Sequence, residues 1–385
     1  MKAEPRSVRT FADAGLKGAA RFSFLVTLAG QLLFAFTVGS AYSFAAARGN
    51  WRGWNRSMTH GYVAGDSAGN LIVVIHIISA VLLLLSGAIQ FVPQVRSRAP
   101  AFHRWNGRVY VVTAFTASLA GFYMLWVRGS VGGFVAHVGV SIQGLLIMVC
   151  AVMALRHARA RDFPAHRRWA LRLFLVVSAA VFVRAAGVLA GLGLEQDTFI
   201  TVTAFGQYLV PLAMLELYFR AQDGGGVANR LAVAGGLSVL TVVLAAGILA
   251  VTLGSWAPRI RRAFDSRTSI GDVLAATIAS AGIESAETQY RALKAAGAPE
   301  YRFDELELND LGYELLRVKD FRDAFRVLEL NAEAYPLSGN SWDSLAEAYM
   351  DAGDTARATA GYLKSLQRNP KNANAVQMLK KLAPP

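Results

Sequence analysis

Cysteine is almost absent from this sequence. Its single residue, Cys150, stands inside a long apolar run. No disulfide can therefore form within the chain, and no cysteine-based metal site exists. A lone cysteine in apolar surroundings is typical of a small buried side chain, and we predict that role for Cys150.

Acidic side chains are scarce in the first two thirds of the chain. Residues 1–255 contain 8 Asp and Glu against 22 Lys and Arg, whereas residues 256–385 contain 18 against 17. The net charge of +13 thus arises in the first part, mostly from short loops between apolar runs. Because cations in such loops orient a membrane protein, they predict a lipid bilayer and no nucleic-acid partner.

Long apolar runs fill residues 22–255, and 54% of the whole chain is hydrophobic. Each run approaches the ~20 residues that cross a ~30 Å hydrocarbon core as a helix. The first run is much longer than the core of a cleavable signal peptide, so we predict a retained span. The runs cover about residues 22–47, 70–93, 107–127, 131–155, 168–191, 198–219 and 231–254. They predict an all-α bundle of about seven membrane spans, preceded by a cytoplasmic segment at residues 1–21.

Loop cations predict the orientation of these spans. With a cytoplasmic N-terminus, the cytoplasmic segments contain 16 Lys and Arg and the outer loops contain 4. This asymmetry is the positive-inside pattern of a bacterial inner-membrane protein. Seven spans then place the C-terminal part outside the cytoplasm.

The C-terminal part contains an internal repeat of 34 residues. Small residues at matching positions let paired helices approach closely, and a proline ends the second helix of each pair. The matching pairs include Gly312 and Ala346, Ala324 and Ala358, and Pro336 and Pro370. The pattern resembles the tetratricopeptide family and implies α-α repeats at residues 305–385. Residues 256–304 are predicted to be a linker and a capping helix (286–296), and a second capping helix is expected at residues 372–382.

The same region also resembles the segment that follows the catalytic domain in many secreted bacterial serine hydrolases. The similar stretches are LNDLGYELL and LNAEAYPLSGNSWDSLAEAYMDAGD. Neither a Ser-x-x-Lys nor a Gly-x-Ser-x-Gly nucleophile occurs in a suitable context. The resemblance therefore implies a location outside the cytoplasm and not hydrolysis.

Four histidines recur at two depths of the predicted bundle. His103 in FHRWNGRVY and His166 in HRRWALR begin apolar runs at the inner boundary. His76 and His137 each stand about seven residues inside a run that enters from the outer side, which is ~10 Å deep at ~1.5 Å per residue. The second and fourth spans thus carry one pair, and the third and fifth spans carry the other.

Two stacked pairs of histidines in a four-helix core, at about residues 70–190, are what two b-type haems require. The propionates of a haem also need cations nearby. Candidates are Arg104, Arg108, Arg167, Arg168 and Arg172 at the inner level and Arg184 nearer the outer level. The alternative is that each histidine is an interfacial polar group without a ligand. Trp105 and Trp169 are better explained as interfacial anchors.

The histidine pattern resembles the two-haem transmembrane cytochromes of the ascorbate-dependent ferric-reductase type. That resemblance implies iron ligation by His76 with His137 and by His103 with His166. A closer similarity is to a bacterial membrane-protein family catalogued as domain of unknown function 2306, over about residues 70–190. It is carried by IHIISAVLLLLSGAIQFVPQVR, FHRWNGRVY and HRRWALRLF followed by Arg184. The family name itself implies no activity.

Three classes of function follow. The leading hypothesis is haem-based electron transfer across the membrane, from a donor on one face to an acceptor on the other. The alternative is a non-catalytic scaffold whose tail binds a protein or peptide outside the cytoplasm. A transporter that uses the histidines as proton or metal sites is less supported, because the sequence lacks an inverted repeat with broken helices.

Other intramembrane polar residues are predicted to have structural roles. Gln90 and Gln143 are expected to bridge helices. Glu216 is expected to pair with an arginine such as Arg220, four residues later on the same helix. His60 and His157 are expected to be solvated.

Overall fold

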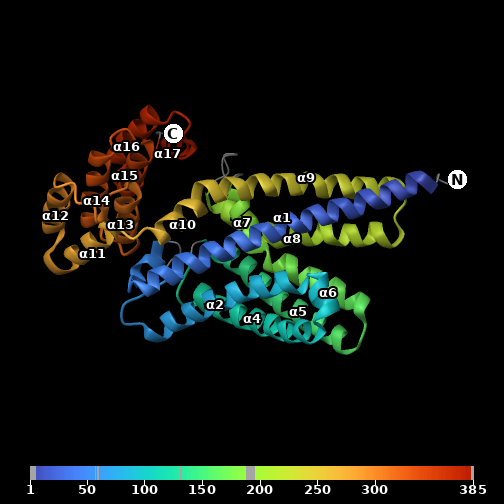
Figure 1. Ribbon diagram of the computed structural model, residues 1–385. Helices are drawn as coiled ribbons and strands as arrows, with labels where there is room; N and C mark the ends of the chain where they lie inside the picture. Colours follow the sequence, from blue (N-terminus) through green and yellow to red (C-terminus); the bar gives the residue numbers. More distant parts are fainter. Residues whose placement is uncertain (1–5, 57, 59, 131, 188–195, 383–385) are drawn as a thin grey trace. The chain divides into compact units, whose positions relative to one another are not determined.

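The chain is almost entirely helical, as predicted. The computed structural model describes residues 6–56, 58, 60–130, 132–187 and 196–382, and Figure 1 shows their secondary structure. It contains two compact units. The membrane unit comprises Met1–Arg48 and Thr59–Phe264, and the tail unit comprises Gly49–Met58 and Asp265–Pro385.

The membrane unit is built from long apolar helices joined by short connections. Its elements are α1 (Arg6–Ala47), α2 (Ser67–Gln90), α3 (Pro93–Arg98), α4 (Pro100–Trp126), α5 (Phe134–Arg159), α6 (Phe163–Val177), α7 (Ala179–Ala185), α8 (Gln196–Gly224), α9 (Val227–Val251), the π-turn η3 (Thr252–Trp256) and α10 (Ala257–Phe264). Six helices of the described chain are long and apolar enough to cross a membrane: α1, α2, α4, α5, α8, and α9 with its continuation into α10.

The predicted fifth span, residues 168–191, is not one continuous helix. It is divided at Ser178 into α6 and α7, and its last residues, 188–191, lie outside the described residues. The first span also differs from the prediction, because helix α1 already begins at Arg6.

A buried hydroxyl explains the break between α6 and α7. Ser178 is fully buried, and its Oγ donates a hydrogen bond to the carbonyl oxygen of Phe174 at 2.7 Å. Back-bonding of this kind often bends a helix. The same Oγ accepts a hydrogen bond from the side-chain amide of Gln31 on α1, also at 2.7 Å. The break is thus joined to α1 by a polar contact deep in the apolar interior.

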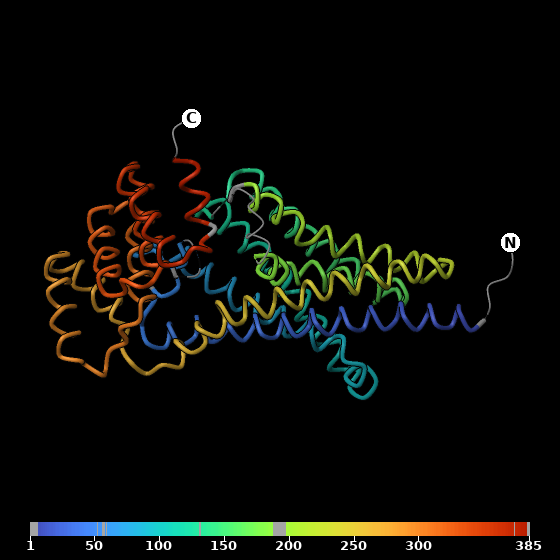
Figure 2. Tube along the Cα trace, turned by 90° about the horizontal axis from the view of Figure 1, so that it is seen from above, coloured from blue at the N-terminus to red at the C-terminus, as the bar shows by residue number. Residues whose placement is uncertain are grey.

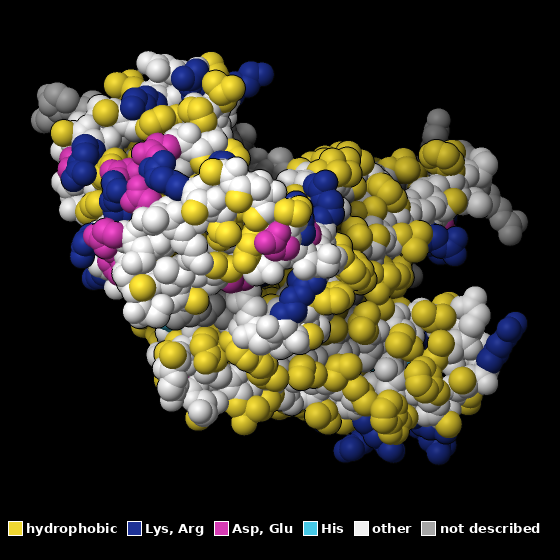
Figure 3. Space-filling model, turned by 60° about the vertical axis from the view of Figure 1, so that its left-hand side comes forward, with side chains coloured by type: hydrophobic (Ala, Val, Ile, Leu, Met, Phe, Trp, Pro, Cys, Tyr) yellow, Lys and Arg dark blue, Asp and Glu magenta, His cyan; other side chains and the backbone are white. Residues whose placement is uncertain are grey.

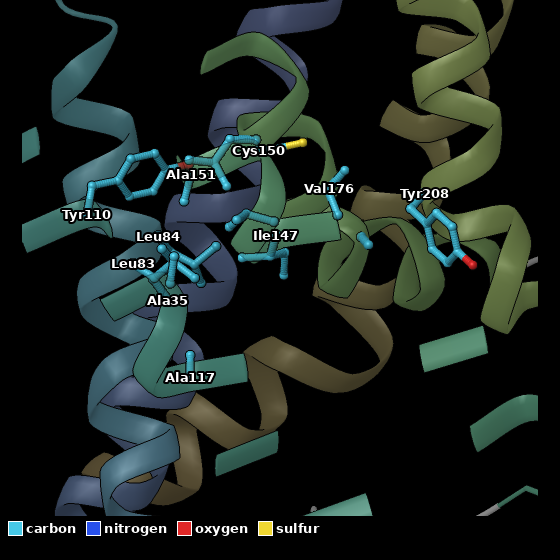
Figure 4. Close-up of a cluster of buried hydrophobic side chains, with 14 residues drawn as sticks. Ala35, Leu83, Leu84, Tyr110, Ala117, Ile147, Cys150, Ala151, Val176 and Tyr208 are labelled. Carbon is cyan, nitrogen blue, oxygen red and sulfur yellow. The ribbon is translucent and has the colours of Figure 1, made fainter. Parts of the chain in front are cut away.

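The helices around the histidines pack in chain order. Helices α2, α4, α5 and α6 lie side by side, each against the next (Figure 1). A buried apolar cluster fills this part of the unit, with Leu83 on α2, Tyr110 on α4 and Cys150 on α5 (Figure 4). Cys150 is free and buried, as predicted.

Helices α1 and α9 form the second extensive contact of the membrane unit, and Figure 2 shows them running side by side. Asp13 and Arg230 form an ion pair at one end of this contact. Further along, a Cβ atom on Gly30 would lie 2.7 Å from the side chain of Ile248. The absence of a side chain at Gly30 therefore permits the close approach of the two helices.

Much of the membrane unit's surface is apolar. Hydrophobic side chains form broad areas in Figure 3, while acidic and basic side chains gather elsewhere on the molecule. Large exposed apolar residues on α8 and α9 include Val202, Leu209, Val210, Leu217, Val239, Leu240, Val242, Val243 and Leu249. An apolar surface of this extent on long helices matches association with a lipid bilayer.

The tail unit is a stack of short antiparallel helices. Its elements are η1 (Trp51–Arg56), β1 (Thr268–Ser269), α11 (Ile270–Ala281), α12 (Ile283–Ala295), β2 (Tyr301–Arg302), α13 (Glu305–Arg317), α14 (Phe321–Ala334), α15 (Gly339–Asp351), α16 (Thr355–Arg368) and α17 (Ala373–Leu382). Strands β1 and β2 pair in parallel. Helices α13 and α15 begin 34 residues apart, as do α14 and α16.

Small residues hold each helical hairpin of the tail together. A Cβ atom on Gly312 of α13 would lie 2.5 Å from Leu328 of α14, and one on Gly361 of α16 would lie 2.8 Å from Ala346 of α15. Ala346 is fully buried. The close contacts therefore fall on positions of the 34-residue repeat.

A segment from the loop between α1 and α2 belongs to the tail unit. The side-chain amide of Asn50 donates a hydrogen bond to Asp272 of α11. The guanidinium of Arg317 on α13 donates to the backbone carbonyl of Asn55. The tail is thus assembled from two parts of the chain that lie more than 200 residues apart.

We expect Ser178→Ala to destabilise the membrane unit, because it leaves the buried amide of Gln31 without a partner. The cost should be about 1 kcal/mol, read as a lower apparent thermal midpoint in detergent. Adding Gln31→Leu should recover most of the loss. Thr116→Ala, which removes a hydroxyl bonded only within its own helix, is the control. If Ser178→Ala and Thr116→Ala lowered the thermal midpoint equally, this role of Ser178 would be contradicted.

Candidate functional site

The FHRWNGRVY motif forms the beginning of α4, and one of its faces docks on α2. The side-chain amide of Asn106 donates to the backbone carbonyl of Ser86 at 2.9 Å, and Asn106 is buried. One turn earlier, the side chain of Gln90 donates to the backbone carbonyl of His103 at 3.0 Å. The amides of this motif and of α2 therefore join the two helices.

Glycine and tyrosine continue the same contact. A Cβ atom on Gly87 of α2 would lie 2.9 Å from the ring of Tyr110 on α4. Tyr110 is buried beside Leu83 and Leu84, as Figure 4 shows. Much of this motif is thus explained by close packing of α4 on α2.

The opposite face of the motif points outward. Trp105 is 60% exposed, and Arg104 and Arg108 are exposed as well. Among the described residues, neither arginine has an ion pair or hydrogen bond to a side chain. Trp105 fits the predicted interfacial anchor, and both cations are available to an anionic group.

His76 and His166 make the same kind of contact with a neighbouring helix. The Nδ1 atom of His76 on α2 lies 3.0 Å from the carbonyl oxygen of Ala117 on α4. The Nδ1 atom of His166 on α6 lies 2.9 Å from the carbonyl oxygen of Ala154 on α5. Because a carbonyl only accepts, Nδ1 carries the hydrogen in both rings, and Nε2 of the neutral ring keeps its lone pair. A metal-binding histidine is commonly fixed in this way.

His103 and His137 each keep a buried ring nitrogen without a partner among the described residues. These atoms are Nδ1 of His103 and Nε2 of His137. The His137 ring lies edge-on to Trp126, with 5.5 Å between the ring centroids. Buried polar atoms normally find a partner, and the hydroxyls of Tyr110 and Ser118 share this feature with the two nitrogens.

The four histidines are brought together unequally. His103 and His166 are within range of an electrostatic interaction, but no described contact joins their rings. His76, in contrast, contacts α4 at Ala117 and near Gly121, whereas His137 contacts α4 at Trp126. Five residues of helix separate Gly121 from Trp126, or roughly 7 Å. No described contact joins His76 to His137.

Two of the candidate arginines have carboxylate partners. Arg168 of α6 forms an ion pair with Asp223 of α8. Arg172 binds both oxygens of Glu216, at 2.7 and 3.0 Å. Glu216 thus pairs with an arginine, as predicted, but the partner is Arg172 and not Arg220, because α6 packs on α8.

The other candidate cations make different contacts. Arg184 donates to the carbonyl oxygen of Ala180 at 2.7 Å, and its guanidinium lies 4.3 Å from the centre of the Phe34 ring. Arg167 is exposed, and Trp169 lies 4.8 Å from the guanidinium of Arg172. In the part of the chain that is described, no group of three or more His, Cys, Asp and Glu side chains could hold a metal ion.

The two glutamines have the predicted bridging role. Gln90 joins α2 to α4, and the side chain of Gln143 on α5 donates to the backbone carbonyl of Val176 on α6 at 3.3 Å. His157, predicted to be solvated, lies 3.2 Å from the carboxylate of Asp162 in an exposed contact, and His60 is exposed.

Sequence reasoning missed a large cavity in the membrane unit. Its volume is about 1180 Å³, and its walls come from α1 and α6 to α9, with Phe91 beyond the end of α2. None of the four histidines lines it. Pro211, a proline within α8, lies in the wall of this cavity. It is the sequence feature that could have indicated an irregular, loosely packed helix here.

Part of the chain matches the model of a known protein family. Residues 73–219 match the family described as "Predicted membrane protein (DUF2306)". The matched segment extends from α2 into α8 and contains all four histidines. No curated protein and no solved structure matches the chain. The match supports a membrane protein with several apolar helices and assigns no chemistry to it.

If the motif docks α4 on α2, Gly87→Ala should be costly, because the added Cβ would collide with the Tyr110 ring. We expect a loss of roughly 1–3 kcal/mol, read as a lower thermal midpoint in detergent. The matched control is Gly235→Ala, since a Cβ at this helical glycine meets no atom within 4 Å. It should be neutral or slightly stabilising. Equal midpoints for the two variants would argue against the docking role.

Proposed function

We propose that the membrane unit binds b-type haem through its histidines and carries electrons across a bacterial inner membrane. The observation that carries this proposal is the pair His103 and His166. The two rings lie on different helices, α4 and α6, and within range of an electrostatic interaction. One has a buried nitrogen without a partner, and the other has Nδ1 fixed by a carbonyl, which leaves Nε2 free.

The chemistry of the side chains fits the group. A low-spin haem iron takes two neutral imidazoles from facing helices, and four imidazoles are available in this bundle. We assign the first haem to the inner pair, His103 and His166. His76 and His137 supply the same donors, but they contact α4 at different depths. The assignment of a second haem to them is the less supported part of the proposal.

When bound, haem supplies a one-electron redox couple. The surrounding residues hold its ligands in place: the carbonyl of Ala154 orients the ring of His166, and Gln90 ties the turn that bears His103 to α2. Arg104 and Arg108 are the cations for the propionates, since they are exposed and have no carboxylate partner among the described residues. Arg168 and Arg172 are already paired with Asp223 and Glu216.

An optical spectrum of the detergent-purified chain, oxidised and then reduced with dithionite, tests this proposal. We expect reduced b-type bands, and we expect His166→Ala and His103→Ala each to remove at least half of the haem bound per chain. His157→Ala, at a ring bonded to Asp162 outside the bundle core, should leave the haem content unchanged. A folded, colourless protein made with ample haem would overturn the proposal.

The tail supports a second function, that of a scaffold which binds a protein or peptide outside the cytoplasm. Its period and small-residue contacts are those of a tetratricopeptide-like stack, in which the first helices of successive pairs line one face. On these helices, Asn374 of α17 donates to Asp343 and Glu347 of α15 at 2.9 and 2.8 Å. Tyr313 of α13 also donates to Glu347. Burial raises the pKa of both carboxyl groups. This polar face suits hydrogen bonding to a peptide segment of a partner.

The composition of the tail unit also bears on topology. Because it joins the α1–α2 loop segment to residues 265–385, both parts belong on one side of the membrane. The chain between them must therefore cross an even number of times. Helices α2, α4, α5, α8 and α9 give five crossings, so the broken pair α6–α7 supplies the sixth. With a cytoplasmic N-terminus, as the loop cations favour, the tail lies outside the cytoplasm.

Cysteine labelling of intact cells with a membrane-impermeant maleimide tests this arrangement. In a Cys150→Ala background, Arg48→Cys in the α1–α2 loop and Leu337→Cys in the tail should both be labelled. Arg159→Cys at the end of α5 should react only after the cells are opened. Labelling of Arg48→Cys without Leu337→Cys would contradict the sixth crossing.

A further inference from the structure

The cavity of the membrane unit is long and bounded mainly by apolar side chains. Along α8, its wall extends from Val202 to Tyr218. At ~1.5 Å per residue this is roughly 24 Å, most of the ~30 Å thickness of a hydrocarbon core. Some wall residues, such as Val202 and Val210, are also exposed on the outer surface of the unit. The cavity therefore opens on the apolar surface that faces lipid.

The cavity is wide near its middle, where the wall formed by α8 has little side-chain volume. A Cβ atom on Gly206 would meet no other atom within 4 Å. One turn further, Pro211 has no backbone N–H, so the carbonyl of Gln207 lacks its usual helical donor. The wall thus combines open apolar space with one exposed backbone acceptor.

One end of the cavity is cationic. Lys17 and Arg21 lie one turn apart on α1; both line the cavity and both are exposed. Neither has an ion pair or hydrogen bond to another described side chain. Nearby, Arg230 is already paired with Asp13. The positive charges of Lys17 and Arg21, which no described carboxylate neutralises, therefore lie at one end of the cavity.

We infer that the cavity binds one anionic phospholipid, with its acyl chains along α8 and α9 and its phosphate against Lys17 and Arg21. Charge complementarity selects this occupant: a neutral isoprenoid or sterol would leave both cations without a counterion, whereas a phosphate accepts from both. Anionic lipids are also abundant in the leaflet that faces the cytoplasm, where the loop cations place Lys17 and Arg21. This site is separate from the histidines and does not depend on haem.

Two pairs of variants of the full chain test the charge and the space separately. Lys17→Gln with Arg21→Gln removes the cations at the cavity, and Arg96→Gln with Arg98→Gln removes two exposed cations of α3 that do not line it. Gly206→Phe fills the cavity, and Gly235→Phe adds the same ring at an exposed helical glycine outside it. Retained lipid is measured by native mass spectrometry after reconstitution with phosphatidylglycerol or phosphatidylcholine and a delipidating wash.

We expect the unmodified chain to retain one phosphatidylglycerol per protein and at least five times less phosphatidylcholine. Removal of Lys17 and Arg21 should abolish this preference, and Gly206→Phe should remove both lipids, while the two control variants behave like the unmodified chain. Equal retention of the two lipids by the unmodified chain, or equal loss in a variant and its control, would overturn the inference. So would retention of a neutral isoprenoid in place of phospholipid.

Discussion

The membrane unit depends on one constraint: a polar group inside hydrocarbon has no water to bond with, so it must find its partner in the protein. Many of its polar side chains accordingly bond either to a neighbouring helix or to a carbonyl of their own helix. Asn106, Gln90 and Gln143 all donate to carbonyl groups of an adjacent helix. His76 and His166 do the same with one ring nitrogen. Among the described residues, Nδ1 of His103 and Nε2 of His137 depart from this rule, as do the hydroxyls of Tyr110 and Ser118.

The same constraint divides the membrane unit into a dense part and an open part. Where Gly87 faces Tyr110, no space remains between helices α2 and α4. Where α8 faces α1 and α9, Gly206 and Pro211 leave a cavity of about 1180 Å³. The dense part holds its side chains in fixed positions. The open part has mainly apolar walls.

The all-α fold, the apolar spans and the bridging glutamines could be predicted because each is encoded within one segment of the chain. The break at Ser178 could not, since its partner Gln31 lies 147 residues away in sequence. The pairing of Glu216 with Arg172 likewise depends on how α6 packs on α8. Whether two histidines of different spans meet depends on the register between helices, which no single span encodes. Register is set by side chains such as Tyr110, which no periodicity reveals.

The contact between Asn50 and Asp272 has a consequence for the order of assembly. During synthesis, the loop that bears Asn50 emerges early, and its partner helix follows only after the remaining spans have been made. The loop segment must therefore wait, unpaired, while about 200 residues are inserted into the membrane. Arg317 of α13, which also contacts this loop segment, is made later still. The loop part of the tail unit can therefore reach its partners only after the spans between them have been synthesised.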